Sequence, residues 1–300
     1  MAKEKEARRP FNLKKEVKLL PGYIILLLWV IFTIALLGWV FGASFSTTAE
    51  IFQGKALKFE SGLHFENYAK AWNGAGVAGF FGNSLIYSVI SCTILILVCA
   101  PAAYVLSRFK FKSQKIWNVM FMAGLFINVN YIVVPIFLML NNADGKLRQW
   151  FGEPFFLNNL FILALVYAST ALPFTIYLLS GYFKSLAKDY EEAAYVDGAG
   201  YWRTMIQVIM PMAKPSIVTV ILFNFLAFWN EYIISMTLLT RPEIKTLPVG
   251  LMNLMAAQKS AVQYGQMYAG LVIVMIPTLI LYICVQKKLT QGMTLGGLKG

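Results

Sequence analysis

Charged residues and metal ligands are scarce in this chain of 300 residues. Only 13% of the residues are charged, whereas about 25% is usual for soluble domains. The one histidine, His64, has no second ligand at helical spacing, so we expect a surface residue rather than a metal ligand. The cysteines fit neither a zinc motif nor a disulfide framework, and we expect them to pack as small apolar side chains. They are Cys92, Cys99 and Cys284.

Two further absences narrow the function. The sequence contains no Gly-x-x-x-x-Gly-Lys-Ser/Thr, the phosphate-binding loop through which many proteins bind ATP, so ATP is not expected as a cofactor of this chain. An ion-driven transporter needs several ionisable groups inside the membrane, and a membrane enzyme needs clustered catalytic or metal-binding side chains. The apolar segments contain one carboxylate, that of Glu231, so both classes are disfavoured.

Apolar residues are abundant and are concentrated in long segments. They make up 58% of the chain, and six segments reach the roughly 20 residues that cross a bilayer. The sequence therefore predicts an all-α polytopic membrane protein with six transmembrane helices. The expected spans are 23–41, 84–106, 116–140, 158–181, 217–239 and 269–285. Four of them contain a proline that is expected to kink the helix, namely Pro101, Pro135, Pro173 and Pro277.

The net charge of +12 follows the membrane sides, so we do not interpret it as nucleic-acid binding. Eighteen of the 26 Lys and Arg residues lie in the termini and in alternate loops, and eight lie in the other loops. Because cytoplasmic loops carry the Lys and Arg excess, both termini are predicted to be cytoplasmic. The predicted organisation is a basic N-terminus (1–22), a permease domain (23–289) with a cytoplasmic loop (182–215), and a C-terminal tail (290–300).

The loop 182–215 is built like a helical hairpin. Asp189 and Glu192 have the spacing of a helix cap and its capping-box partner. Ala193 and Ala194 are expected to present a smooth surface that a partner can approach closely. Asp197 and Gly198 form a turn signal in which the glycine adopts a left-handed conformation.

A second helix is expected to follow this turn. Its apolar residues are predicted to share one face, Pro211 to end it, and Pro215 to begin the fifth span. The residues of that face are Trp202, Met205, Ile206 and Ile209. Two interpretations fit these features: a docking site for a partner, or a hairpin lying on the membrane surface.

The loop resembles the EAA loop of ATP-binding-cassette (ABC) importer permeases. The family's motif reads Glu-Ala-Ala, three residues, Gly, nine residues, Ile-x-Leu-Pro, and the residues that match it are Glu192, Ala193, Ala194, Gly198 and Pro211. Val208 and Met210 occupy the Ile and Leu positions as conservative departures. Asp197 and Ala199 complete the Asp-Gly-Ala of its sugar-type members. Further stretches resemble carbohydrate permeases of the maltose type: 64–68, 81–84, 229–232, 246–251 and 296–300.

The resemblance implies the type I permease fold of ABC importers and a subunit of the bacterial cell membrane that performs no catalysis. Its implied partners are a second permease, forming a heterodimer, two ATPase subunits that bind ATP, and an extracytoplasmic binding protein. It implies uptake of a carbohydrate, with an oligosaccharide favoured. A permease for polyamines or phosphate esters stays open as an alternative.

Polar residues inside the predicted spans are candidates for the translocation path. Glu231 either lines the route, accepting hydrogen bonds from sugar hydroxyls, or holds neighbouring helices together through Asn224 or Asn230. A group in the third span offers amides and an aromatic ring, which suit sugars, although interhelical hydrogen bonding is an equal alternative. Its members are Asn128, Asn130 and Tyr131.

Overall fold

The structure is a computed structural model that describes residues 13–74, 76–151, 154–257 and 263–297. Within these ranges the regular structure is entirely helical, as predicted. The chain forms two compact units. One comprises the residues up to Tyr68 together with Gln263–Val272, and the other comprises the remainder.

The first unit contains a long apolar helix and a small folded loop. Helix α1 (Leu13–Ser44) includes the first span and buries none of its apolar stretch within the chain. Its end is held by the stretch 64–68: the Asn67 side chain donates to the backbone oxygens of Ser44 and Ser46, and the Tyr68 hydroxyl lies 2.7 Å from Ser44 Oγ. Residues of α3 (Glu66–Ala69) therefore fasten the loop to the helix that precedes it.

The loop in the first unit folds around Glu50 of α2 (Thr48–Phe52). Its carboxylate accepts hydrogen bonds from the backbone and hydroxyl groups of Thr47 and of Ser61. These donors lower the pKa of Glu50 from 4.5 to about 2. His64 is half-buried, with Nε2 2.9 Å from Ser61 Oγ, and so belongs to the same network.

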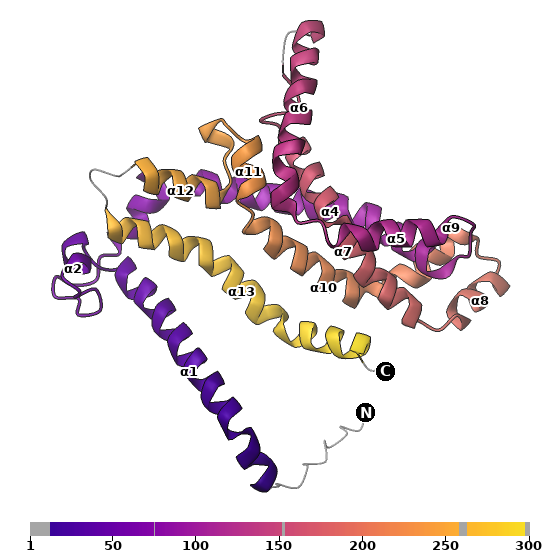
Figure 1. Ribbon diagram of the computed structural model, residues 1–300, viewed down its shortest axis with the longest axis horizontal. Coiled ribbons are helices and arrows are strands. Elements are labelled where there is room, and N and C mark those ends of the chain that lie inside the picture. Colours follow the sequence, from indigo (N-terminus) through magenta and orange to yellow (C-terminus); the bar gives the residue numbers. More distant parts are fainter. Residues whose placement is uncertain (1–12, 75, 152–153, 258–262, 298–300) are drawn as a thin grey trace. The chain divides into compact units, whose positions relative to one another are not determined.

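The second unit is a bundle of helices connected by short turns (Figure 1). Its longest elements are α4 (Val77–Arg108), α7 (Leu160–Ser185), α10 (Met210–Trp229) and the larger part of α13 (Tyr264–Gly297). The shorter ones are η1 (Lys70–Gly74), α5 (Gln114–Gly124), α6 (Val129–Phe151), α8 (Asp189–Val196), α9 (Tyr201–Thr204), η2 (Met205–Ile209), α11 (Ile233–Leu238), η3 (Pro242–Ile244) and α12 (Leu247–Ala257).

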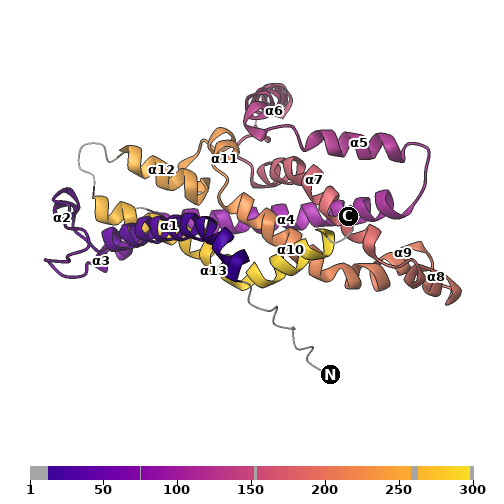
Figure 2. The ribbon, with the colours of Figure 1, turned by 60° about the horizontal axis from the view of Figure 1, so that its bottom comes forward.

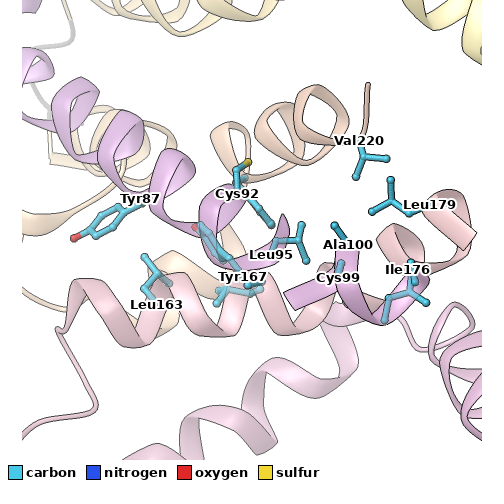
Figure 3. Close-up of a cluster of buried hydrophobic side chains, with 14 of the residues drawn as sticks. Tyr87, Cys92, Leu95, Cys99, Ala100, Leu163, Tyr167, Ile176, Leu179 and Val220 are labelled. Carbon is cyan, nitrogen blue, oxygen red and sulfur yellow. The ribbon is translucent and has the colours of Figure 1, made fainter. Parts of the chain in front are cut away.

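The core of this unit lies where α4 packs against α7 and α10, and Figure 3 shows side chains of all three helices gathered there. Small residues let the backbones of α4 and α7 approach closely, as is typical of membrane helices: Ala103 and Ala164 are fully buried, and the Ser180 hydroxyl donates to the Ala103 carbonyl. Cys92 and Cys99 are buried in this core as free thiols, in keeping with their expected packing role. The Cys284 side chain lies outside the described residues.

In the part of the chain that the structure describes, five helices are long and apolar enough to cross a membrane, and the number is six if a bent pair of helices forms one span. The predicted first, second and sixth spans lie within α1, α4 and α13, and the predicted fourth span, 158–181, begins two residues before α7. The four predicted kink prolines lie inside α4, α6, α7 and α13.

The predicted third span is not one continuous helix. Helices α5 and α6 meet at a bend of 103°, which Figures 1 and 2 show as α6 turning away from α5. The break covers 125–128, where three consecutive i→i+3 hydrogen bonds end the helix and the Asn128 side chain accepts from the backbone N–H of Asn130. An apolar stretch of 25 residues indicates a span but does not exclude such a local turn.

The predicted fifth span, 217–239, is displaced. One helical segment runs from Tyr201 to Trp229, and a break at 230–232 separates it from α11. The helix does not end at Pro211, because a π-helical turn over Met205–Ile209 widens the backbone directly before the proline, and Pro211 lies in the first turn of α10.

Loops assigned to the same membrane side lie together in this unit. Asn83 and Tyr87 of α4 donate to the backbone of 243–245, and Asn158 accepts from Thr240 and Arg241. All of these loops are predicted to be outside. At the other end, Arg108 contacts the loop after α7, and both of those segments are predicted to be cytoplasmic.

Candidate functional site

The segment that matches the EAA motif folds as a helical hairpin, here called the α8–α9 hairpin (residues 187–209), at one end of the second unit (Figure 1). The turn between its helices is a Schellman motif: Gly198 N–H donates to the Tyr195 carbonyl and Ala199 N–H to the Ala194 carbonyl. Gly198 has φ +74°, so the predicted left-handed glycine is confirmed. Because side chains oppose this conformation, the turn explains the glycine of the motif.

The predicted capping box at the start of α8 is wrong. The residue before the helix is Lys188, no side chain caps the helix, and Asp189 is already inside it. The first turn instead carries Asp189, Glu191 and Glu192, whose negative charges favour the positive end of the helix dipole. The acidic residues therefore stabilise the start of the helix through their negative charge and not through a side-chain cap.

The two alanines of the motif have different environments. Ala194 is 8% exposed, on a helix that packs against η2 and α9, so it does not present an outer surface as predicted. Its small size serves the internal packing of the hairpin. Ala193 is exposed, together with Glu192 and Asp197, and these three residues are open to a partner.

The predicted single apolar face of the second helix is also wrong. Met205 and Ile209 are buried, whereas Trp202 is 65% exposed and Ile206 58% exposed. The widened turn over 205–209 rotates successive side chains away from the positions of a regular helix. Large apolar side chains therefore remain uncovered on the hairpin.

The hairpin carries several large apolar side chains that this chain leaves exposed. They are Tyr190, Tyr195, Val196, Trp202 and Ile206. Apolar side chains grouped on one element are typical of surfaces that meet a protein or a membrane.

The hairpin is attached to the bundle by an ion pair and by contacts between aromatic rings. Arg108 Nε, at the end of α4, lies 3.0 Å from Glu191 Oε1, and the Arg108 guanidinium also donates to the Ala187 carbonyl. The ring of Tyr201 in α9 lies edge-on to Phe109 and is tilted against Tyr104. The hairpin is therefore packed on α4 as well as being continuous with α7 and α10.

A second polar arrangement lies at the break between α10 and α11. Glu231 Oε1 accepts from Ile234 N–H at 2.7 Å, and Oε2 accepts from Ser235 N–H and from the Tyr167 hydroxyl. The carboxylate thus caps α11 and joins it to α7. Of the two sequence-based assignments, this geometry favours helix packing, but through Tyr167 and not through Asn224 or Asn230.

The other polar candidates divide between interior and surface. Asn224 is buried and donates to Thr175 Oγ1 of α7 and to the Val220 carbonyl, so in this chain it acts between helices. Asn230 is exposed and donates only to Leu226 in its own helix. Of the translocation candidates, Asn224 is therefore closed off within the chain, whereas Asn230 remains open.

The candidates of the third span lie at the bend. Asn128 and Asn130 are exposed, and Tyr131 is 81% exposed, directly before and in the first turn of α6. An open groove of about 570 Å³ runs along the neighbouring helix α5, with Gln114, Lys115 and Asn118 among its lining residues. The bend thus presents amides and an aromatic ring on a surface that this chain leaves uncovered.

A second groove, about 550 Å³, has an entirely apolar lining that includes Trp72, Phe81, Trp229 and Pro277. It offers no hydrogen-bonding groups to a sugar. Its chemistry suits hydrocarbon chains or apolar side chains of another helix.

Sequence reasoning did not single out Arg108, Glu191 or Tyr167 as site residues. Arg108 was one of many cytoplasmic basic residues, and Glu191 stood beside the motif glutamate. One feature of the sequence pointed to Arg108: it lies just after an apolar span and is followed by an aromatic residue, Phe109.

Comparison with known proteins agrees with this architecture. Residues 74–295 match the family described as binding-protein-dependent transport system inner membrane component. The chain belongs to this family. The matched region contains both the α8–α9 hairpin and the α10–α11 break.

Individual relatives cover nearly the whole chain. The diacetylchitobiose uptake system permease protein NgcG of Streptomyces coelicolor is 35% identical over 92% of this chain and 87% of its own length. The galactooligosaccharides transport system permease protein GanQ of Bacillus subtilis is 28% identical over 96% and 98%. A crystal structure of a bacterial ABC transporter that imports the acidic polysaccharide alginate contains a chain that superposes with a TM-score of 0.76. That chain is 23% identical, covers 93% of this chain and 99% of its own length, and supports the permease fold.

Proposed function

We propose that this chain is a permease subunit of an ATP-driven ABC importer and forms, with a second permease, the membrane pathway for an oligosaccharide. An extracytoplasmic binding protein delivers the sugar, and two ATPase subunits bind and hydrolyse ATP. The chain itself performs no hydrolysis. The cell membrane of a bacterium is its location, with the termini and the α8–α9 hairpin in the cytoplasm.

The single observation that carries the proposal is the α8–α9 hairpin. It lies at one end of the bundle and combines a glycine turn, the exposed residues Glu192, Ala193 and Asp197, and exposed large apolar side chains such as Trp202. A partner that closes and opens around such an element biases the arrangement of the helices to which it is attached. Coupling of this kind needs two distinct states and different contacts in each.

The carbohydrate assignment rests on the relatives and on the chemistry of the bend. The names of NgcG and GanQ refer to a disaccharide and to oligosaccharides. Asn128, Asn130 and Tyr131 offer amide groups and a ring face, which match sugar hydroxyls and the apolar face of a pyranose. Glu231, with its carboxylate occupied by three donors, is assigned to support of the pathway and not to sugar contact.

Reconstitution tests the proposal. The chain is purified with its second permease and its ATPase and placed in vesicles with the binding protein of the same system. Ligand screening of that binding protein with oligosaccharides, polyamines and phosphate esters identifies the solute. We expect uptake that requires ATP and an oligosaccharide ligand. Uptake driven by an ion gradient without ATP would overturn the importer assignment, and a polyamine or phosphate-ester ligand would overturn the carbohydrate assignment.

A further inference from the structure

The contact between Arg108 and Glu191 is unusual for its burial. The two side chains are 5% and 12% exposed, and the Nε–Oε1 distance is 3.0 Å. Two charges removed from water require good geometry and further hydrogen bonds, and Arg108 also donates to the Ala187 carbonyl at 3.1 Å. Because a buried ion pair adds little net stability by itself, this pair is a candidate for a role other than stabilisation.

The pair joins two elements that are far apart in the sequence. Arg108 is the last residue of α4, and Glu191 lies in the first turn of α8. Helix α4 is the centre of the second unit, with the most extensive packing against α7 and further packing against α10. The ion pair therefore links α8 directly to the central helix of the bundle, in addition to the packing of α8 on η2.

Aromatic rings also connect the hairpin with α4 and α7. Tyr104 of α4 has ring centroids 5.7 Å from Phe109, 5.7 Å from Phe183 of α7 and 5.9 Å from Tyr201 of α9. The Tyr182 hydroxyl donates to the Met212 carbonyl of α10. The ends of α4 and α7 and the start of the long helix 201–229 thus meet at the base of the hairpin. Helix α8 is separate from these three helices, and the Arg108–Glu191 pair joins it to α4.

We propose that the Arg108–Glu191 pair is a positioning clasp that makes α8 move with α4, so that displacement of the hairpin by the ATPase reorients the bundle. This inference rests on the proposed function. Both residues act through helix position and touch neither substrate nor nucleotide. Without the clasp, α8 can shift on its turns while α4 stays in place, and ATP is hydrolysed without movement of the pathway.

The decisive variant removes both charges together. Arg108→Met/Glu191→Met leaves no unpaired buried charge and fills similar volume with flexible apolar side chains, so the chain is expected to fold. The matched control is Lys112→Gln, a nearby exposed basic residue. Each is reconstituted with its partners, and three quantities are measured: ATPase co-purification, the thermal unfolding midpoint, and the number of solute molecules moved per ATP hydrolysed.

For the double variant we expect wild-type co-purification, a midpoint close to that of the wild type, and at least a fivefold lower number of solute molecules per ATP. Lys112→Gln is expected to keep the wild-type ratio. A wild-type ratio in the double variant would overturn the clasp, and loss of insertion or of co-purification would assign the pair to folding and also overturn it. If the wild-type complex shows no ATP-dependent uptake, the proposed function fails first, and that result is separate from any difference between variants.

Discussion

At the scale of single residues, the most informative side chain is a carboxylate inside an apolar segment. Glu231 satisfies three donors at a helix break: the Tyr167 hydroxyl and the backbone N–H groups of Ile234 and Ser235. The cost of placing this charge among apolar helices is offset by charge-assisted hydrogen bonds and by the start of α11. The geometry explains why a helix that reads as continuous from its apolar residues breaks at this point.

Two replacements of Glu231 distinguish the effect of its charge from the effect of its hydrogen bonds. Glu231→Leu leaves all three donors unpaired, each at a cost of about 1–3 kcal/mol, so we expect a clearly lowered thermal midpoint. Glu231→Gln keeps an acceptor oxygen and is expected to keep the fold with a smaller loss. Midpoints are measured on the purified chain in detergent. Thr237→Val is the control, because its hydroxyl bonds only within α11; equal midpoints for Glu231→Leu and this control would contradict the capping role.

Glu50 offers a test by pH in the loop of the first unit. Its folded pKa of about 2 lies below the value of 4.5 for the free group, so its stabilising effect is complete above about pH 4.5 and is lost as the pH falls toward 2. We expect proteolysis of the loop 45–68 in intact vesicles to increase over this range in the wild type. Glu50→Gln is expected to show high proteolysis throughout, and the same pH dependence in both chains would disprove the assignment.

At the scale of elements, the hairpin turn depends on one backbone conformation. Gly198 has φ +74° and nothing within 4 Å of an added Cβ, so substitution there meets backbone strain and no clash. Gly200 also has open space around it, but its φ is −74°, which suits any residue. We expect Gly198→Ala to cost about 1–2 kcal/mol and to lower ATPase co-purification, and Gly200→Ala to do neither. Identical behaviour of the two variants in pull-down and thermal unfolding would refute a role for the left-handed turn.

The two alanines of the motif provide a second matched pair. Ala194 is buried against η2, so Ala194→Leu overpacks the hairpin and is expected to destabilise it by about 1–3 kcal/mol. Ala193 is exposed, so Ala193→Leu is expected to leave stability unchanged and to weaken ATPase binding by obstructing close approach. Thermal unfolding and pull-down together distinguish the two effects. Unfolding of the chain by Ala193→Leu but not by Ala194→Leu would contradict both assignments.

At the scale of the whole molecule, the sequence predicted helix type well and helix ends poorly. Long apolar stretches identify spans, and three of the six predicted spans lie inside single helices while a fourth begins two residues before its helix. The breaks at 125–128 and 230–232 arise from local hydrogen bonds of Asn128 and Glu231, which compete with the helix by small energies that apolar periodicity does not reveal. Pro211 was predicted to end a helix, but the π-helical turn before it lets the helix continue.

The candidate site was predictable where it depended on backbone geometry, and less so where it depended on contacts between distant segments. Gly198 was identified from its turn signal, and the exposed Ala193 from the motif. The burial of Ala194 and the pairing of Arg108 with Glu191 require the packing of α8 on η2 and α4, over a separation of 83 residues for the ion pair. Spacing along one helix carries no information about such partners.

Membrane orientation is the last prediction, and it follows from charge and from packing independently. Basic residues place the α8–α9 hairpin and the end of α4 in the cytoplasm, and the Arg108–Glu191 pair brings these two segments to the same end of the bundle. Asn83 and Asn158 likewise join loops that are all predicted to be outside. Single cysteines at Ser185 and Gln53, in a chain without its native cysteines, are exposed to an impermeant thiol reagent in intact cells. Because the loop that contains Gln53 is predicted to be outside, we expect Gln53 to be labelled and Ser185 to be protected until the cells are opened. Labelling of Ser185 alone in intact cells would invert the topology and remove the hairpin from any cytoplasmic ATPase.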